Sequence, residues 1–358
     1  MLNFTVGPVM SAPEVLELGA QSAPYFRTPE FSKIMLENEE RMLAFLRAPE
    51  GSRCVFLTTS GTGGMESVVM NVLRASDRVI AVNGGSFGER FANLSVLHGR
   101  ETAEIRLPFG AQITAEDLAP FEGAGYTALL VNMDETSSGI LYDMRLLSDF
   151  CRRNGVLLVV DAISAFLSDE IDMEALGAAV VITGSQKALA VAPGVAVIAL
   201  APEALRRVFE NPETCLYLSL RQALTNGERG QTPFTPAVTT LLQIHRRLEL
   251  IEERGGIAAE RARIRRIALL FREKIAPYGF APVAQAPSFA VTALRAPGRN
   301  AREIVRVMKD EYDIWLCPNG GEIGEEVFRV GHIGEISEAD IETLMKAFAA
   351  LKARGIIG

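Results

Sequence analysis

A lysine and an aspartate stand at the ends of two neighbouring apolar runs. Lys187 lies in "TGSQKALAVAPG" (183–194), directly after Ala178–Ile182, and Asp161 closes the run "VLLVVD". Small and apolar neighbours would desolvate the Lys187 ammonium, which lowers its pKa and favours the neutral amine that forms a Schiff base. A carboxylate one strand away can keep the nitrogen of a pyridine ring protonated, so that the ring accepts electrons. Taken alone, the aspartate is equally well explained as a helix N-cap and the lysine as a surface residue.

A glycine-rich turn follows an earlier apolar run. In "TTSGTGGMES" (58–67) the amides of Gly61 to Gly64, at the start of an expected helix, and the hydroxyls of Ser60 and Thr62 would suit a phosphate dianion. The turn is neither the G-x-G-x-x-G pattern nor a P-loop, because no lysine follows the glycines. Glycine-rich turns also arise for steric reasons, so both interpretations stay open at this point.

Two further strand ends carry side chains that could contact a planar ligand. Phe87, among the glycines of "NGGSFGER", is either a packing residue or an aromatic plate stacked on a ring. In "MDETSSG" (133–139) the hydroxyls of Thr136, Ser137 and Ser138 can satisfy the backbone of a turn. One of them can also bond a phenolic oxygen.

Arg329 lies inside the apolar stretch "VFRVGHIGE", where an unpaired guanidinium would be costly. Either an internal acid such as Glu322 or Glu335 pairs with it, or it receives a ligand. Arginine is suited to a bidentate grip on a carboxylate.

Short apolar runs that alternate with amphipathic segments would position these residues. The runs are apolar at consecutive positions, which is typical of strands covered on both faces and hence of a mainly parallel α/β sheet. In such sheets functional residues gather at the carboxyl ends of the strands. Strands are expected at residues 54–58, 78–82, 128–133, 155–162, 178–184 and 194–200, and helices at 65–74, 143–153 and 202–209.

A second domain is expected towards the C-terminus. From Pro236 to about Lys274 the chain predicts two helices broken at Gly255-Gly256, and the remainder alternates short strands with helices. A chain of 358 residues is long enough for one large core and a smaller one. We expect an N-terminal segment at 1–15, a large domain at 16–255 and a small α+β domain at 256–358.

Composition narrows the class of protein. Hydrophobic residues make up 48% and charged residues 22%, as in globular proteins, and the net charge is -8 without a basic block. These values argue against nucleic acid or an anionic membrane as partner. Four scattered cysteines and three histidines argue against a disulfide framework and a metal site. Without a signal-like segment or a long apolar run, we expect a soluble, cytoplasmic protein.

Together the motifs resemble the fold-type I, class V aminotransferases that use pyridoxal phosphate. The resemblance is greatest to the alanine–glyoxylate/serine–pyruvate group and to the 2-aminoethylphosphonate–pyruvate transaminases. It covers nearly the whole chain in the expected order, and "GSQKALAVAPG" is its most specific piece. It implies a mainly parallel seven-stranded sheet in the large domain and a small α+β C-terminal domain.

The resemblance also implies a role for each residue that would contact the cofactor. Lys187 resembles the lysine that forms the Schiff base and then moves the proton, and Asp161 resembles the partner of the pyridinium nitrogen. Phe87 would stack on the ring, and Thr136 would bond the ring oxygen O3′. The phosphate cradle would consist of Ser60, Gly61, Thr62 and Gln186.

Substrate and subunit contacts are implied in the same way. Thr235, in "GQTPFTPAV", matches a threonine lent to the phosphate of the neighbouring subunit, which implies a homodimer with shared active sites. Arg329 matches the arginine that clamps the substrate carboxylate. The opening "FTVGP" resembles a glycine-proline segment that lines the substrate pocket near Gly7 and Pro8.

The function implied is a ping-pong transaminase that moves an amino group from a small donor of the alanine or serine type to a 2-oxo acid such as glyoxylate or pyruvate. Departures in "MDETSSG", at Gly63 and in "PNGGEIGEE" (318–326) leave the donor open, and "FRVGHIGE" is closer to the phosphonate transaminases, which are the alternative.

Two other functions would each explain part of the sequence. A cysteine desulfurase or lyase of the same fold needs a reactive cysteine or a stacked histidine, for which Cys317 is the candidate thiol. A non-catalytic phosphate-binding module would use "SGTGG", but it explains neither Lys187 nor Arg329.

Overall fold

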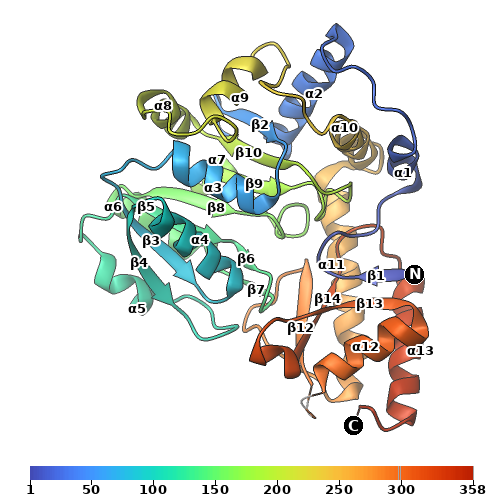
Figure 1. The fold of residues 1–358 in the computed structure, drawn as a ribbon. Coiled ribbons are helices and arrows are strands. Elements are labelled where there is room, and N and C mark those ends of the chain that lie inside the picture. Colours follow the sequence, from blue (N-terminus) through green and yellow to red (C-terminus); the bar gives the residue numbers. More distant parts are fainter. Residues whose placement is uncertain (297, 299, 358) are drawn as a thin grey trace.

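A seven-stranded sheet forms the centre of the larger part of the computed structural model, which describes residues 1–296, 298 and 300–357 (Figure 1). Strand β10 runs antiparallel to both of its neighbours, and the other strands of this sheet share one direction. In spatial order the strands are β2 (Arg53–Leu57), β10 (Ala196–Leu200), β9 (Ala178–Gly184), β8 (Leu157–Asp161), β5 (Ala128–Asn132), β3 (Arg78–Asn83) and β4 (Glu101–Arg106). The mainly parallel α/β fold predicted from the sequence is confirmed.

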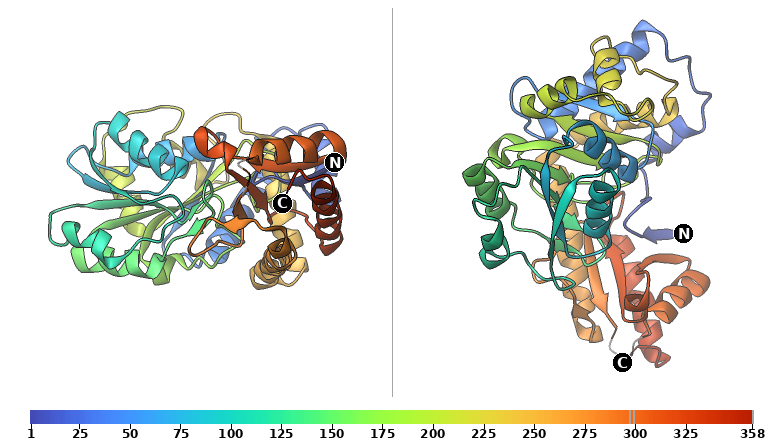
Figure 2. Two further views of the ribbon diagram at one scale, coloured as in Figure 1. Left: turned by 90° about the horizontal axis from the view of Figure 1, so that it is seen from below. Right: turned by 60° about the vertical axis from the view of Figure 1, so that its left-hand side comes forward.

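Helices cover both faces of this sheet, which explains why its strands are apolar at successive positions (Figure 2). In β8, Leu158 and Val160 pack into one cluster of buried side chains, while Leu157 and Val159 pack into another on the opposite face. The first cluster includes residues of α2 (Pro29–Phe45), α6 (Met144–Asn154) and α10 (Val238–Glu253). The second includes residues of α3 (Gly61–Asn71), α4 (Ser86–Leu97), α8 (Pro202–Glu210) and α9 (Leu220–Gly227).

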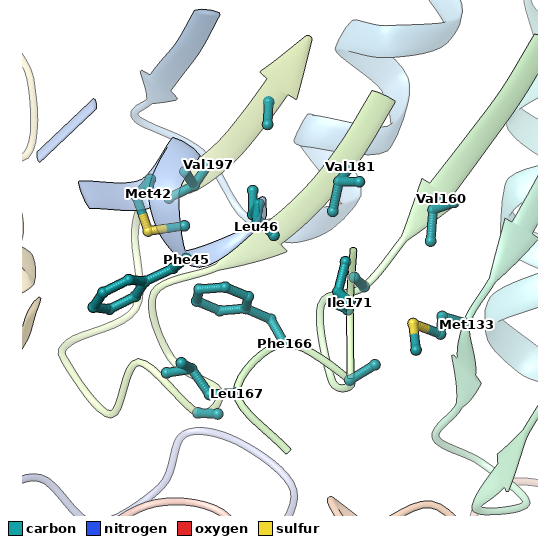
Figure 3. Close-up of a cluster of buried hydrophobic side chains, with 14 of the residues drawn as sticks. Met42, Phe45, Leu46, Met133, Val160, Phe166, Leu167, Ile171, Val181 and Val197 are labelled. Atoms are coloured by element: carbon teal, nitrogen blue, oxygen red, sulfur yellow. The ribbon is translucent and has the colours of Figure 1, made fainter. Parts of the chain in front are cut away.

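The first cluster also fixes the segment that follows Asp161. Figure 3 shows Phe45 of α2 and Phe166 of that segment near the strand residues Val181 and Val197. Burying one such aromatic or aliphatic side chain contributes about 1.5–3 kcal/mol. The backbone on the C-terminal side of Asp161 is therefore held by the core.

A second sheet of mixed direction belongs to the C-terminal part of the chain and includes the first strand of the protein. Its spatial order is β1 (Leu2–Phe4), β13 (Ile314–Pro318), β14 (Val327–Gly331), β12 (Val291–Arg295) and β11 (Ala281–Pro282). A third buried cluster joins this sheet to α11 (Gly256–Ile275), α12 (Ala301–Tyr312) and α13 (Glu338–Ala353). Shorter elements are α1 (Pro13–Gly19), α5 (Ala115–Leu118), α7 (Met173–Leu176), β6 (Asp134–Glu135) and β7 (Ile140–Leu141).

The expected domain boundary falls at a helix break. Helix α10 ends at Glu253 and α11 begins at Gly256, on either side of Gly255, which has a φ of 103°. The division into segments 1–15, 16–255 and 256–358 stays a prediction, and positions 297, 299 and 358 lie outside the described residues. In the described part of the chain, no helix is both long and apolar enough to cross a membrane.

Candidate active site

The carboxyl ends of β8 and β9 and the start of α3 surround a cavity of about 110 Å³. Its lining contains every residue that the sequence predicts for cofactor contact except Thr235. Larger hollows of about 410 and 630 Å³ lie elsewhere on the protein, and neither is lined by any of the predicted residues. The cavity is lined by Ser60, Gly61, Thr62, Met65, Phe87, Arg90, Asp134, Thr136, Asp161, Ile163, Ser164, Gln186 and Lys187.

Lys187 reaches this cavity from the turn that follows β9. Its side chain is buried, and Nζ donates a hydrogen bond to the carbonyl oxygen of Val6 at 2.7 Å. Gly7 packs against the aliphatic part of the lysine, because a Cβ at this position would lie 2.8 Å from Lys187 Cδ, and its φ is 133°. The N-terminal segment therefore contacts the lysine directly, and a side chain at Gly7 would disturb it.

Burial lowers the pKa of the Lys187 ammonium from 10.5 to about 8. Cys317, Asp134 and Asp161 oppose this effect when they are ionised, while the guanidinium of Arg329 adds to it. A substantial fraction of the amine is therefore neutral near pH 8, as nucleophilic attack requires.

The lowered pKa predicts the pH dependence of Lys187 reactivity in the cofactor-free protein. The rate at which acetic anhydride acetylates this amine, followed by mass spectrometry, should rise with pH and level off above about pH 8. The exposed Lys346 in the same digest shows how the acetylation rate of an unburied lysine depends on pH. A rate at Lys187 that keeps rising to about pH 10.5 would contradict the prediction.

Asp161 is the last residue of β8 and lies beside Asn132, its register partner at the end of β5. The amide of Asn132 donates to Oδ2 of Asp161, and the backbone N–H of Ile163 donates to Oδ1 at 2.8 Å. Burial raises the Asp161 pKa to about 6, although these two hydrogen bonds act to lower it. At neutral pH the carboxylate is therefore ionised in most molecules and held in one orientation.

Phe87 is held at the start of α4 by Glu135. The backbone N–H groups of Phe87 and Gly88 donate to Oε2 of Glu135 at 3.1 and 2.8 Å, and the Ser137 hydroxyl donates to Oε1 at 2.5 Å. The first turn of a helix has unpaired N–H groups and a partial positive charge. A buried carboxylate accepts hydrogen bonds from the N–H groups and interacts favourably with the charge. Glu135 thus caps α4 and sets the position of the aromatic ring.

Arg90 is a site residue that the sequence motifs did not indicate. Its guanidinium lies over the Phe87 ring at 4.9 Å from the centroid, and Nη1 donates to Oγ1 of Thr62 at 3.0 Å. This arrangement brings a cation to the start of α3, where a phosphate would be bound. The signal in the sequence was its position three residues after Phe87, on the same face of a helix.

The start of α3 has the geometry of an anion site. The hydroxyl of Ser60 caps the helix by accepting from the N–H of Gly63 at 3.4 Å, and the other amides of the first turn have no acceptor within the helix. A Cβ at Gly61 would lie 2.4 Å from Cδ1 of Ile163. A side chain at this position would therefore require the end of the Ile163 side chain to move.

Arg329 contacts Thr136 of the cavity wall but is not itself among the residues that line the cavity. The hydroxyls of Thr136 and Ser164 share a hydrogen bond of 2.6 Å, and Nη1 of Arg329 donates to the Thr136 carbonyl at 3.2 Å. Nη2 of Arg329 donates to the carbonyl of Pro318 at 2.6 Å. Backbone oxygens thus orient the arginine. In the described part of the protein, no carboxylate accepts a hydrogen bond from it.

Glu335, one of the two acids that could pair with Arg329, is engaged elsewhere. Glu335 forms ion pairs with Arg247 at 3.2 Å and with Arg254 at 2.9 Å. In the residues that the structure describes, no ion pair joins Arg329 to Glu335 or to Glu322. Of the two explanations that the sequence left open, the structure favours an arginine that can receive a ligand.

Thr235 and Cys317 are not among the residues that line the cavity. The Thr235 side chain is exposed, in a separate hollow lined also by Tyr217. Cys317 is half-buried in β13 and is the register partner of Arg329 in β14. The structure therefore brings neither residue to the cavity wall.

Arg247 connects the lysine turn to the C-terminal part of the chain. Its buried guanidinium donates to the carbonyl of Leu189 at 3.2 Å, two residues after Lys187, and pairs with Glu260 of α11 at 2.5 Å and with Glu335. A buried charge that loses its partner is strongly destabilising. The Lys187 turn therefore depends on an ion pair that lies between α10 and α11.

Arg247→Met should lower the free energy of unfolding by about 3–5 kcal/mol, because Glu260 stays buried with one partner fewer. Denaturant unfolding measures this change. The matched control is Arg254→Met, whose partly exposed pair with Glu335 should contribute only about 0–1 kcal/mol. Equal, small losses in both variants would refute the role assigned to Arg247.

Comparison with known proteins identifies the family. A model described as aminotransferase class-V matches residues 19–317. The chain therefore belongs to the class-V aminotransferases and is a transaminase.

Individual relatives cover most of the chain. A protein named soluble hydrogenase 42 kDa subunit, from Anabaena cylindrica, is 30% identical over 88% of this chain and 83% of its own length. An L-aspartate–glyoxylate aminotransferase from Paracoccus denitrificans is 27% identical over 94% of this chain and 87% of its own length. The crystal structure of a subgroup IV aspartate aminotransferase from Thermus thermophilus has a TM-score of 0.90 and 27% identity and covers 99% of both chains.

Family membership implies dependence on pyridoxal phosphate, and the cavity fits this group. Oε1 of Gln186 and Oδ1 of Asp134 are buried and have no hydrogen-bond partner in the described part of the protein. Buried polar atoms are rarely left unpaired, so this wall suits a polar occupant. The start of α3 would suit its phosphate, and Asp161 would suit its ring nitrogen.

Proposed function

We propose that this transaminase binds pyridoxal phosphate in the cavity at Lys187 and moves an amino group from a small donor of the alanine or serine type to a 2-oxo acid such as glyoxylate or pyruvate. The observation that carries the proposal is the buried Lys187 amine, with its lowered pKa, in one cavity with the buried carboxylate of Asp161. The similarity to a glyoxylate-dependent relative supports the acceptor.

The bound cofactor supplies an electron sink for the pair of electrons left when the donor loses its α-proton. Lys187 Nζ would hold the cofactor and would take the α-proton of the donor and return it. Asp161 would keep the ring nitrogen protonated through a charge-assisted hydrogen bond. Phe87, fixed by Glu135, would cover one face of the ring.

Ser60, Gly61, Thr62 and Gln186, together with Arg90, would hold the phosphate. Thr136 would bond the ring oxygen. These assignments rest on the cavity lining and on the hydrogen bond between Arg90 and Thr62.

Arg329 would hold the carboxylate of both substrates, and Gly7, which packs against Lys187, would lie near the substrate. Arg329→Lys keeps the charge but loses the planar fork, so KM for glyoxylate should rise about 10- to 100-fold, with a smaller change in kcat. Steady-state kinetics at a saturating donor concentration measure this change. An unchanged KM would remove Arg329 from the substrate site.

The protein would act as a homodimer in which Thr235 of one subunit contacts the phosphate in the other. Its exposed position, away from the cavity of its own chain, supports this arrangement. Thr235→Ala should then weaken cofactor binding without changing the hydrogen bonds around Lys187.

A half-reaction screen tests the donor. The loss of the visible absorbance of the bound cofactor is followed with alanine, serine, aspartate or 2-aminoethylphosphonate in the absence of acceptor. Alanine or serine should react fastest. A much faster reaction with the phosphonate would instead select the phosphonate transaminase, and release of sulfide from cysteine that disappears in Cys317→Ser would select the desulfurase.

A further inference from the structure

Asp134 places an unpaired carboxyl oxygen on the wall of the cavity. The side chain is 4% exposed, and its Oδ2 accepts a hydrogen bond from the Ser288 hydroxyl at 2.8 Å. Oδ1 is buried and has no partner among the residues described. The cofactor roles assigned above do not use this carboxyl group.

The hydrogen bonds around Ser288 determine which oxygen can carry a proton. Oγ of Ser288 accepts from the N–H of Ala290 at 3.1 Å and donates its own proton to Oδ2 of Asp134. Oδ2 is therefore occupied as an acceptor. A proton bound by the Asp134 carboxyl group is then located on Oδ1, the oxygen without a protein partner.

We propose that Asp134 is a ligand-binding residue that acts as a neutral carboxylic acid and donates a hydrogen bond from Oδ1 to an anionic oxygen of the occupant of the cavity. That oxygen belongs to the cofactor ring or to the substrate carboxylate. The proposal rests on the proposed function only in taking pyridoxal phosphate as the occupant.

Burial and two neighbouring carboxylates favour the neutral form of Asp134. Burial raises the Asp134 pKa well above the usual range, and the carboxylates of Asp169 and Glu135 raise it further. The Ser288 hydrogen bond and the ammonium of Lys187 act in the opposite direction, and the guanidinium of Arg272, on α11, also faces this carboxyl group.

The neutral and ionised forms would have opposite effects on the ligand. A neutral acid donates a strong hydrogen bond to an anionic oxygen, whereas a carboxylate at the same place repels it. The donor is present below the pKa of Asp134 in the folded protein and is lost as the pH rises through that value. Ligand affinity should therefore fall with increasing pH.

Asp134→Asn and Asp134→Ala separate this role from simple packing. In the Asn variant, the side-chain oxygen still accepts from Ser288, and Nδ2 replaces the Oδ1 proton as a donor at every pH. In the Ala variant the donor is absent.

The experiment measures the affinity of the cofactor-free protein for pyridoxal phosphate by absorbance titration, and KM for glyoxylate in the loaded enzyme. At a pH below the pKa of Asp134 in the folded protein, Asp134→Asn should stay within about threefold of the wild type in both. Asp134→Ala should weaken the cofactor about tenfold if the ring oxygen is the acceptor, or raise KM about tenfold if the substrate carboxylate is. The ratio of the wild-type to the Asn-variant dissociation constant should rise with pH, because only the wild type loses its donor. If the substrate carboxylate is the acceptor, the ratio of KM values should rise instead. Lys187 and Asp161 titrate in both proteins, so their effects cancel in these ratios.

Equal behaviour of the wild type and Asp134→Ala in both measurements would overturn the proposal. A tenfold loss in a folded Asp134→Asn would do the same, and this variant remains informative if the Ala variant does not fold. Failure of the proposed function is a separate result, since the wild type itself would then not bind pyridoxal phosphate.

Discussion

Lys187→Ala should abolish the visible absorbance of the bound cofactor and lower turnover by at least about 10³-fold. The variant removes the amine that attaches the cofactor and also the group that moves the α-proton, and acid–base transfer alone contributes about 10²–10⁴-fold. Absorbance spectra and steady-state rates with alanine and glyoxylate measure the two effects. The buried hydrogen bond to Val6 is lost as well, which thermal unfolding would record separately.

Lys346→Ala is the matched control for this variant. Lys346 is exposed on α13 and lies outside the lining of the cavity, so its loss should leave absorbance and rate unchanged. Retained absorbance and turnover in Lys187→Ala would refute the assignment of the active site.

Asp161→Asn should lower turnover by about 10²–10³-fold, the scale of losing one preorganised electrostatic contact. The fold should survive, because the substitution preserves shape and the retained oxygen can still accept from the N–H of Ile163. Asn132 can adapt as well. Its Oδ1 is buried without a partner in the described chain and could accept from the new amide after a side-chain flip.

The comparison of two variants separates charge from packing. Asp161→Asn and Asn132→Ala alter the same hydrogen-bonded pair, but only the first removes the carboxylate from the end of β8. Rates measured after cofactor saturation should therefore fall far more in Asp161→Asn. Equal losses would indicate that this pair acts through structure alone.

The sequence predicted the parts of the site that stand at the ends of apolar strands. Asp161 closes one run of consecutive apolar residues and Lys187 lies in the turn after another, a pattern that strands buried on both faces require. The strand β4 was not singled out, because "ETAEIR" lies at the edge of the sheet and alternates in polarity. The pairing of β1 with β13 depends on residues more than 300 positions apart and leaves no local signal.

Side-chain contacts between different helices and strands could not be predicted from the sequence either. Arg90 reaches Thr62 from another helix, and Asp134 meets Ser288 from the C-terminal part of the chain. Neither pairing follows from spacing, since both depend on how α3, α4 and β6 are packed. The free charge of Arg329 was one of two open alternatives, and the pairing of Glu335 with Arg247 decided between them.

We propose that the cofactor is attached to Lys187. Borohydride reduction of the loaded enzyme fixes the cofactor to the amine that carries it, and mass spectrometry of the digest locates that residue. We predict that the modified peptide contains "GSQKALAVAPG", with the added mass on Lys187. Modification of another lysine, or of none, would contradict the account.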